Sequence, residues 1–208
     1  MREEATRIAG RLEATLRIPD ETPRGIVVVA HPLPTHGGTM RNPLVASLAR
    51  VVAARGLYAL RFNFRGVGDS DGEWTGGAEE WRDIGAAVDH ARTFAPGLPV
   101  GVTAYSFGAF QTLTWLANGG TVDGLALVGV PLRSVDQTRN ALPPVPDGTF
   151  IVAAEHDQFG SAAELRQALP QARIAEVMGV DHFFVPKRDE VGQLVADELV
   201  RALASKVP

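Results

Sequence analysis

Short apolar runs recur along the chain, and the segments between them carry apolar residues at a helical spacing. The first run, GIVVVAHP at residues 25–32, is continuous and rich in β-branched residues. A run of this kind is typical of a strand buried on both faces of a parallel sheet. Comparable runs occupy residues 57–64, 98–105, 124–130 and 148–155, with a shorter one at 172–177.

The intervening segments predict amphipathic helices. Residues 42–56 place Asn42 before a proline at the first helical position and close on Gly56, which are helix start and stop signals. Further helical patterns cover residues 78–94, 107–120, 161–169 and 189–204.

Alternating strands and helices predict βαβ units, and therefore an α/β fold with a mostly parallel central sheet flanked by helices on both faces. Residues 5–19 alternate at period two and predict antiparallel strands at the N-terminal edge of that sheet. Neither an internal repeat nor a linker divides the sequence, so we expect one domain over residues 1–208.

Composition narrows the classes of function. A formal net charge of −4, without a run of lysine or arginine, does not favour binding to nucleic acid. The sequence has no cysteine, which excludes a thiolate nucleophile and a cysteine zinc site. The opening MREEATRIAG has no apolar core, and no stretch reaches the length of a membrane span, so we expect a cytoplasmic protein.

Polar residues follow the predicted strands, at the sheet edge where α/β proteins form their active sites. In chain order they include Ser106, then Asp157, then His182. Ser106 stands between a strand and a helix, where a serine is either an exposed nucleophile or an ordinary N-cap. The order serine, acid, histidine is that of the α/β-hydrolase triad.

Four segments carry a resemblance to a known family. They read HPLPTHGGTM at 31–40, RFNFRGVGDSDG at 61–72, AYSFGA at 104–109 and GVDHFF at 179–184. In this order they resemble the small, capless bacterial serine hydrolases of the α/β-hydrolase superfamily, over nearly the whole chain. Two positions depart from the pattern: Ala104 replaces the first glycine of G-x-S-x-G, and Leu33 replaces the second histidine of an HPHP motif.

The resemblance implies a role for each triad residue. Ser106 is expected to be the nucleophile, and His182, which precedes the last helix, the general base. Asp157 is expected to orient His182, with Asp136, after the preceding strand, as the alternative acid. The backbone amides of Phe107 and Leu33 are expected to form the oxyanion hole, because the prolines flanking Leu33 have no N–H.

Other features are expected to support the site rather than react. The glycines of RGVGDSDG match a dinucleotide fingerprint only in part and indicate a turn, which Arg65 and Asp69 are expected to hold. His31 is expected to support the Leu33 loop. We expect no cofactor and no metal, since the possible ligands lack a metal-binding spacing: His31, His36, Asp157, Asp181 and His182.

The connection between Val130 and Gly148 is too short for a large cap, which predicts an open cleft. Five aromatic residues are candidates for an apolar acyl pocket, with ordinary core as the alternative: Trp74, Phe107, Phe159, Phe183 and Phe184. The expected function is hydrolysis of a carboxylic ester in a small-molecule acyl substrate, through an acyl-enzyme. A thioesterase, amidase, peptidase or acyltransferase would use the same residues. A non-enzymatic receptor or interaction scaffold of the same fold is the alternative from another class.

Overall fold

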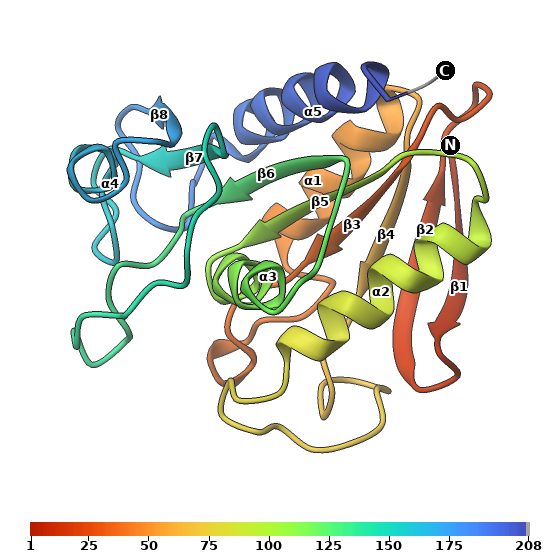
Figure 1. The fold of residues 1–208 in the computed structure, drawn as a ribbon, viewed down its shortest axis with the longest axis horizontal. Coiled ribbons are helices and arrows are strands. Elements are labelled where there is room, and N and C mark those ends of the chain that lie inside the picture. The colour runs from red at the N-terminus through yellow and green to blue at the C-terminus, as the bar shows by residue number, and fades with distance from the viewer. Residues whose placement is uncertain (207–208) are drawn as a thin grey trace.

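Eight strands form a single sheet in the computed structural model, which describes residues 1–206 (Figure 1). Their order across the sheet is β1-β2-β4-β3-β5-β6-β7-β8. The strands are β1 (Arg2–Ile8), β2 (Leu12–Ile18), β3 (Ile26–Ala30), β4 (Tyr58–Phe62), β5 (Val100–Tyr105), β6 (Gly124–Val128), β7 (Phe150–Ala154) and β8 (Arg173–Val177).

The sheet is parallel from β4 to β8, whereas β2 pairs antiparallel with both β1 and β4 at one edge. Strand β3, with the sequence IVVVA, is buried at every position, because helices cover it on both faces. This arrangement confirms the predicted α/β fold with its antiparallel N-terminal strands. It also brings the carboxyl ends of the parallel strands together at one edge.

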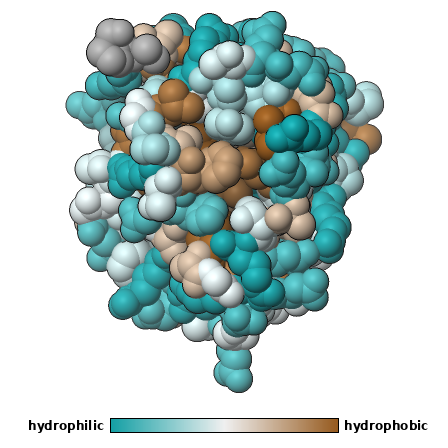
Figure 2. All heavy atoms as spheres, turned by 90° about the vertical axis from the view of Figure 1, so that its right-hand side faces the viewer, coloured by the Kyte–Doolittle hydropathy of each residue, from teal (hydrophilic) through white to brown (hydrophobic). Residues whose placement is uncertain are grey.

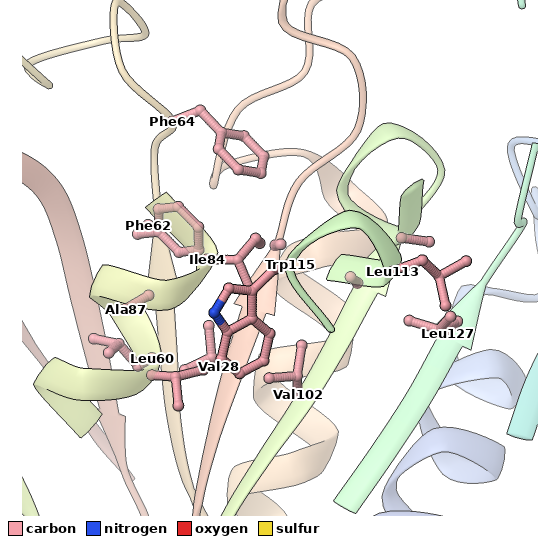
Figure 3. Close-up of a cluster of buried hydrophobic side chains, with 14 of the residues drawn as sticks. Val28, Leu60, Phe62, Phe64, Ile84, Ala87, Val102, Leu113, Trp115 and Leu127 are labelled. Atoms are coloured by element: carbon pink, nitrogen blue, oxygen red, sulfur yellow. The ribbon is translucent and has the colours of Figure 1, made fainter. Parts of the chain in front are cut away.

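Helices cover both faces of the sheet (Figure 1). Helices α2 (Trp81–Phe94) and α3 (Phe107–Ala117) pack on one face, and α1 (Pro43–Ala54) and α5 (Arg188–Ala204) on the other. The short α4 (Ala162–Ala168) lies beside β7 and β8. Figure 3 shows the core on the α2–α3 side, where Trp115 and Leu113 of α3 lie against Val102 and Leu127 of the sheet.

The helix starts follow the capping signals in the sequence. The Asn42 side chain accepts hydrogen bonds from the amides of Leu44 and Val45, and Pro43 occupies the first position of α1. Ser161 and Glu164 form a reciprocal capping box at the start of α4. Local polar bonds thus fix where these helices begin.

The connection from β6 to β7, residues 129–149, carries no helix, so no cap covers the sheet edge there. Within residues 1–206, no helix combines the length and the apolar character that a membrane crossing needs. Figure 2 shows the side of the molecule with the β1–β2 hairpin, where hydrophobic residues form an uneven strip between hydrophilic ones. A small hollow lined by Ala5, Leu16 and Phe94 opens between the hairpin and α2. It adjoins Ile26 at the amino end of β3, and the carboxyl edge described below lies at the opposite end of the strands.

Candidate active site

Ser106 lies on a one-residue turn between β5 and α3. Its backbone has φ 55° and ψ −113°, a conformation that residues other than glycine rarely adopt. The turn is held because the Ser106 amide donates to the Val128 carbonyl at 2.9 Å and its carbonyl accepts from the Phe110 amide at 3.1 Å. Ser106 occupies the N-cap position, yet its side chain makes no capping hydrogen bond, so the ordinary N-cap interpretation does not describe it.

A close approach of helix and strand keeps this turn in place. At Gly108, in the first turn of α3, an added Cβ would meet the carbonyl oxygen of His31 at 2.7 Å and the carbonyl carbon of Ala30 at 3.1 Å. Both are backbone atoms, so only glycine allows α3 to begin directly against β3. The start of α3, and with it Ser106, is therefore fixed relative to the sheet.

The Ser106 hydroxyl contacts His182, which follows β8. Ser106 Oγ lies 2.9 Å from His182 Nε2, and His182 Nδ1 lies 2.7 Å from Asp157 Oδ2. Because a carboxylate only accepts, Nδ1 carries the ring proton, and Nε2 is left free to accept from the serine hydroxyl. The His182 side chain is 5% exposed and that of Asp157 1%, which keeps water away from the bond between them.

Neighbouring groups fix both partners of this bond. The second oxygen of Asp157 accepts from the Phe159 amide at 2.9 Å. The Tyr105 hydroxyl donates to the His182 carbonyl at 2.8 Å, and burial raises the pKa of that phenol far above its usual range. Beneath the imidazole, Gly129 leaves room that a Cβ would occupy, since that atom would lie 3.2 Å from His182 Cε1. The imidazole is thus held in one orientation.

Asp136, the alternative acid, lies in an exposed turn of the β6–β7 connection. Its carboxylate accepts from the Ser134 hydroxyl at 2.5 Å and from the Thr138 amide at 3.0 Å, which holds its pKa below the usual value. Its hydrogen bonds stay within that turn, and Asp157 is the carboxylate that contacts His182.

The proposed oxyanion donors, Leu33 and Phe107, line the same cleft as Ser106. Leu33 precedes the 3₁₀ helix η1 (Pro34–His36), and its carbonyl accepts from the amides of His36 and Gly38. His31 anchors this loop from inside: its Nδ1 bonds the Pro32 carbonyl at 2.7 Å, and its Nε2 accepts from the Phe64 amide at 3.1 Å. Burial lowers the pKa of His31 to about 4, so its ring is neutral, and its two hydrogen bonds hold the loop in place.

Ser106 opens into a cleft of about 400 Å³. Phe107, Phe159 and Phe183 line it, as three of the five aromatic candidates. Phe184 is instead fully buried in the core beneath α1 and α5. Trp74 packs against Phe107, with ring centroids 5.2 Å apart, and is not among the residues that line the cleft.

Comparison with known proteins identifies the family to which this chain belongs. The family model for serine aminopeptidase, S33, matches residues 21–202. The chain belongs to this family. Together with the fold, this membership identifies an α/β serine hydrolase.

Three proteins similar to this hydrolase come from bacteria. An uncharacterized protein of Rickettsia prowazekii is 26% identical over 202 residues, which cover 92% of this chain and 85% of that protein. The structure of an alpha-beta serine hydrolase homologue from Coxiella burnetii is 25% identical, with a TM-score of 0.81, and covers 95% of this chain and 97% of that one. A lidless α/β serine hydrolase from Xanthomonas campestris superimposes with a TM-score of 0.82 at 23% identity, covering 99% of this chain and 95% of that one. This last likeness supports the capless fold.

The RGVGDSDG loop of the hydrolase is held by hydrogen bonds of Arg65 and Asp69. Arg65 donates to Asp83 of α2 through its amide, its Nε and its Nη2, at 3.0, 3.0 and 2.9 Å. Asp69 contributes backbone groups only, its amide donating to Glu13 and its carbonyl accepting from Arg7. Arg65 therefore ties the loop to α2, and the Asp69 backbone ties it to Glu13 and Arg7, so both residues hold the loop as expected.

Two residues that line the cleft, Phe110 and Gln111, were missed in the sequence. They lie three and four positions after Phe107, which is the spacing of one helix face, so a helical wheel drawn from Phe107 would have found them. Within residues 1–206, His, Asp and Glu side chains form no group of three suited to hold a metal ion.

Proposed function

We propose that this hydrolase is a serine esterase that cleaves a carboxylic ester through Ser106, His182 and Asp157. The observation that carries the proposal is the continuous hydrogen-bond chain from Ser106 Oγ through the imidazole to the Asp157 carboxylate, at 2.9 and 2.7 Å. It starts at a serine held in a strained turn and open to a cleft. The residues meet the geometric requirements of a nucleophile, a base and an orienting acid.

The proposed reaction follows from these roles. His182 Nε2 takes the hydroxyl proton as Ser106 Oγ attacks the ester carbonyl, and Asp157 stabilises the resulting imidazolium. The amides of Phe107 and Leu33 hold the developing oxyanion, with the N-terminus of α3 adding its positive dipole end. His182 returns the proton to the leaving alcohol, and a water activated by the same base then releases the acyl group from Ser106.

The charge of the cleft favours an ester with an uncharged acyl group over an aminopeptidase substrate. Of the described residues that line the cleft, none is an aspartate or a glutamate, and the permanent charge among them is that of Arg133. An aminopeptidase must bind the ammonium of a peptide N-terminus, and a desolvated ammonium needs a carboxylate or several acceptors beside it. The aromatic lining, by contrast, suits an apolar acyl chain.

The test is hydrolysis of a p-nitrophenyl ester series, from acetate to long chains, alongside alanine p-nitroanilide as an aminopeptidase substrate. We expect turnover of the esters, loss of that turnover in Ser106→Ala, and full activity in Ser205→Ala, an exposed serine at the end of α5. A labelled fluorophosphonate should be captured by the wild type and by Ser205→Ala only.

Each other outcome has a distinct meaning. Faster turnover of the anilide than of any ester would contradict the ester assignment and favour a peptidase. A folded wild type that captures no fluorophosphonate would contradict a serine nucleophile and favour the receptor or scaffold.

A further inference from the structure

Among the described residues that line the cleft, one side chain has a buried polar atom without a hydrogen-bond partner. Gln111 is 1% exposed and lines the cleft about 1.4 helical turns after Ser106. Its Nε2 donates to the Gly77 carbonyl at 3.1 Å. Its Oε1 is buried and accepts no hydrogen bond from any of residues 1–206. Buried acceptors are nearly always paired in folded proteins, so an unpaired one beside a substrate cleft requires an explanation.

The orientation of this amide is fixed. Exchanging Oε1 and Nε2 would place two acceptors, the side-chain oxygen and the Gly77 carbonyl, against each other, so the bond to Gly77 identifies Oε1 as the free acceptor. Its neighbours in the lining include Phe107 and Phe110, whose rings offer no donor. The adjoining Gly76–Gly77 segment has no side chains, and both residues have positive φ. A ligand group can therefore reach this end of the cleft without displacing a side chain from that segment.

We propose that Gln111 Oε1 determines substrate specificity by accepting a hydrogen bond from a hydroxyl or N–H group on the acyl chain. This inference rests on the proposed esterase function and deepens it. Gln111 and Ser106 line the same cleft five residues apart on the chain, so an acyl chain bound at Ser106 can extend toward Gln111. The substrate class is thus an ester whose acyl chain is apolar near the carbonyl and carries a donor farther along, at a length that the ester series determines.

The experiment compares matched p-nitrophenyl esters in the wild type. Each ω-hydroxyacyl ester, with chains of about four to eight carbons, is paired with the alkyl ester in which a methyl group replaces the hydroxyl. We expect one chain length at which kcat/KM for the hydroxy ester exceeds that of its partner by about five- to tenfold, the value of one hydrogen bond. A ratio at or below one at every chain length would overturn the inference.

Two variants assign the preference to Gln111. Gln111→Met keeps the length of the side chain without the acceptor, and Gln111→Leu removes the acceptor with a different shape. Both should lower the hydroxy-to-alkyl ratio to one or less, whereas Gln167→Met, at an exposed glutamine of α4, should keep the wild-type ratio. A preference that survives in a folded Gln111 variant would overturn the inference, with folding verified by fluorophosphonate capture.

The wild-type series can overturn the inference even where neither variant folds. Failure of the proposed function gives a different result. If no ester is hydrolysed and no fluorophosphonate is captured, the esterase assignment is wrong, and the inference about Gln111 is wrong with it. If the alkyl esters are hydrolysed as fast as the hydroxy esters, the esterase assignment stands and only the role of Gln111 is rejected.

Discussion

Replacing Asp157 by asparagine tests how the acid sets the protonation state of His182. In the native site, Oδ1 of Asp157 accepts from the Phe159 amide at 2.9 Å, and Oδ2 accepts from His182 Nδ1 at 2.7 Å. An asparagine has one acceptor and one donor where the carboxylate has two acceptors. One of the two N–H donors therefore faces the asparagine NH₂ where the native site has a carboxylate oxygen.

Both orientations of the new amide impair the base. If its oxygen stays with Phe159, its NH₂ faces His182 Nδ1, and the ring proton moves to Nε2, which can no longer accept from Ser106. If its oxygen stays with His182, its NH₂ opposes the Phe159 N–H, which leaves a buried amide unpaired at about 1–3 kcal/mol. Either arrangement also loses the charge-assisted bond that stabilises the imidazolium, worth about 1.5–3 kcal/mol.

Together these penalties correspond to a fall in kcat of about 10²- to 10⁴-fold. The assay is the initial rate with p-nitrophenyl acetate, and nitrogen NMR of the imidazole reports directly whether the proton has moved to Nε2 of His182. The matched control is Asp136→Asn, an exposed aspartate with bonds only inside its own turn, which should stay within about twofold of the wild type. A larger loss in Asp136→Asn than in Asp157→Asn, or less than a tenfold loss in the latter, would refute the reasoning.

Three further predictions concern the Leu33 loop, the buried His31 that anchors it, and the Arg65–Asp83 pair that holds the RGVGDSDG loop. Leu33 already has φ −54°, so Leu33→Pro removes its amide donor with little change of backbone. We expect kcat to fall about 10²- to 10³-fold in Leu33→Pro, whereas Leu33→Ala retains activity. Equal activity of the two variants would reject this donor. His31 has its pKa lowered to about 4, so the unfolded chain binds the extra proton between pH 6.5 and 4, and stability should fall by about 3 kcal/mol as the pH drops through that window. Denaturant unfolding at pH 7 and pH 4 should show that fall in the wild type and a smaller one in His31→Gln. Asp83→Ala leaves Arg65 without its buried partner and should cost about 3–5 kcal/mol in unfolding free energy, against about 0.5 kcal/mol or less for Glu79→Ala, whose side chain is 41% exposed. Similar values would contradict a structural role for the pair.

The fold could be predicted because its strands and helices are marked locally. Buried parallel strands require continuous apolar runs, and those runs appear in the sequence where β3 to β8 lie. The exception is β1, which begins at Arg2 rather than Ala5, since its first four residues are exposed and carry no apolar signal. The pairing of Arg2 with Ile18 extends the hairpin there, and that pairing belongs to the tertiary structure.

The start of α2 was misplaced for a similar reason. The helical pattern predicted a beginning near residue 78, but the helix starts at Trp81. The buried carboxylate of Glu80 accepts from both the amide and the hydroxyl of Thr75, which folds the preceding residues back as a turn. This competing side-chain bond leaves no trace in hydrophobic periodicity.

Adjacent aromatic residues show what a motif leaves open. Phe183 and Phe184 both belong to the GVDHFF segment, yet Phe183 is 56% exposed at the cleft and Phe184 is 0% exposed in the core. Phe184 has φ 54°, so the backbone turns between the two residues and sends their side chains to different surroundings. From the sequence alone, Phe183 and Phe184 are equally good candidates for the cleft lining or the core. The choice between Asp136 and Asp157 was open in the same way, because both follow strands and only the position of His182 decides.

The departure at Ala104 shows where the strain of the nucleophile turn lies. From the motif, a small residue is expected at position 104 and alanine is expected to add strain. Ala104 is instead an ordinary buried member of β5, paired with Ala30 and Leu127. The unusual backbone is at Ser106 itself, and the close approach to β3 is at Gly108, where a Cβ would meet backbone atoms. The turn therefore depends on glycine after the nucleophile, and alanine before it is accommodated because a strand residue needs no special conformation.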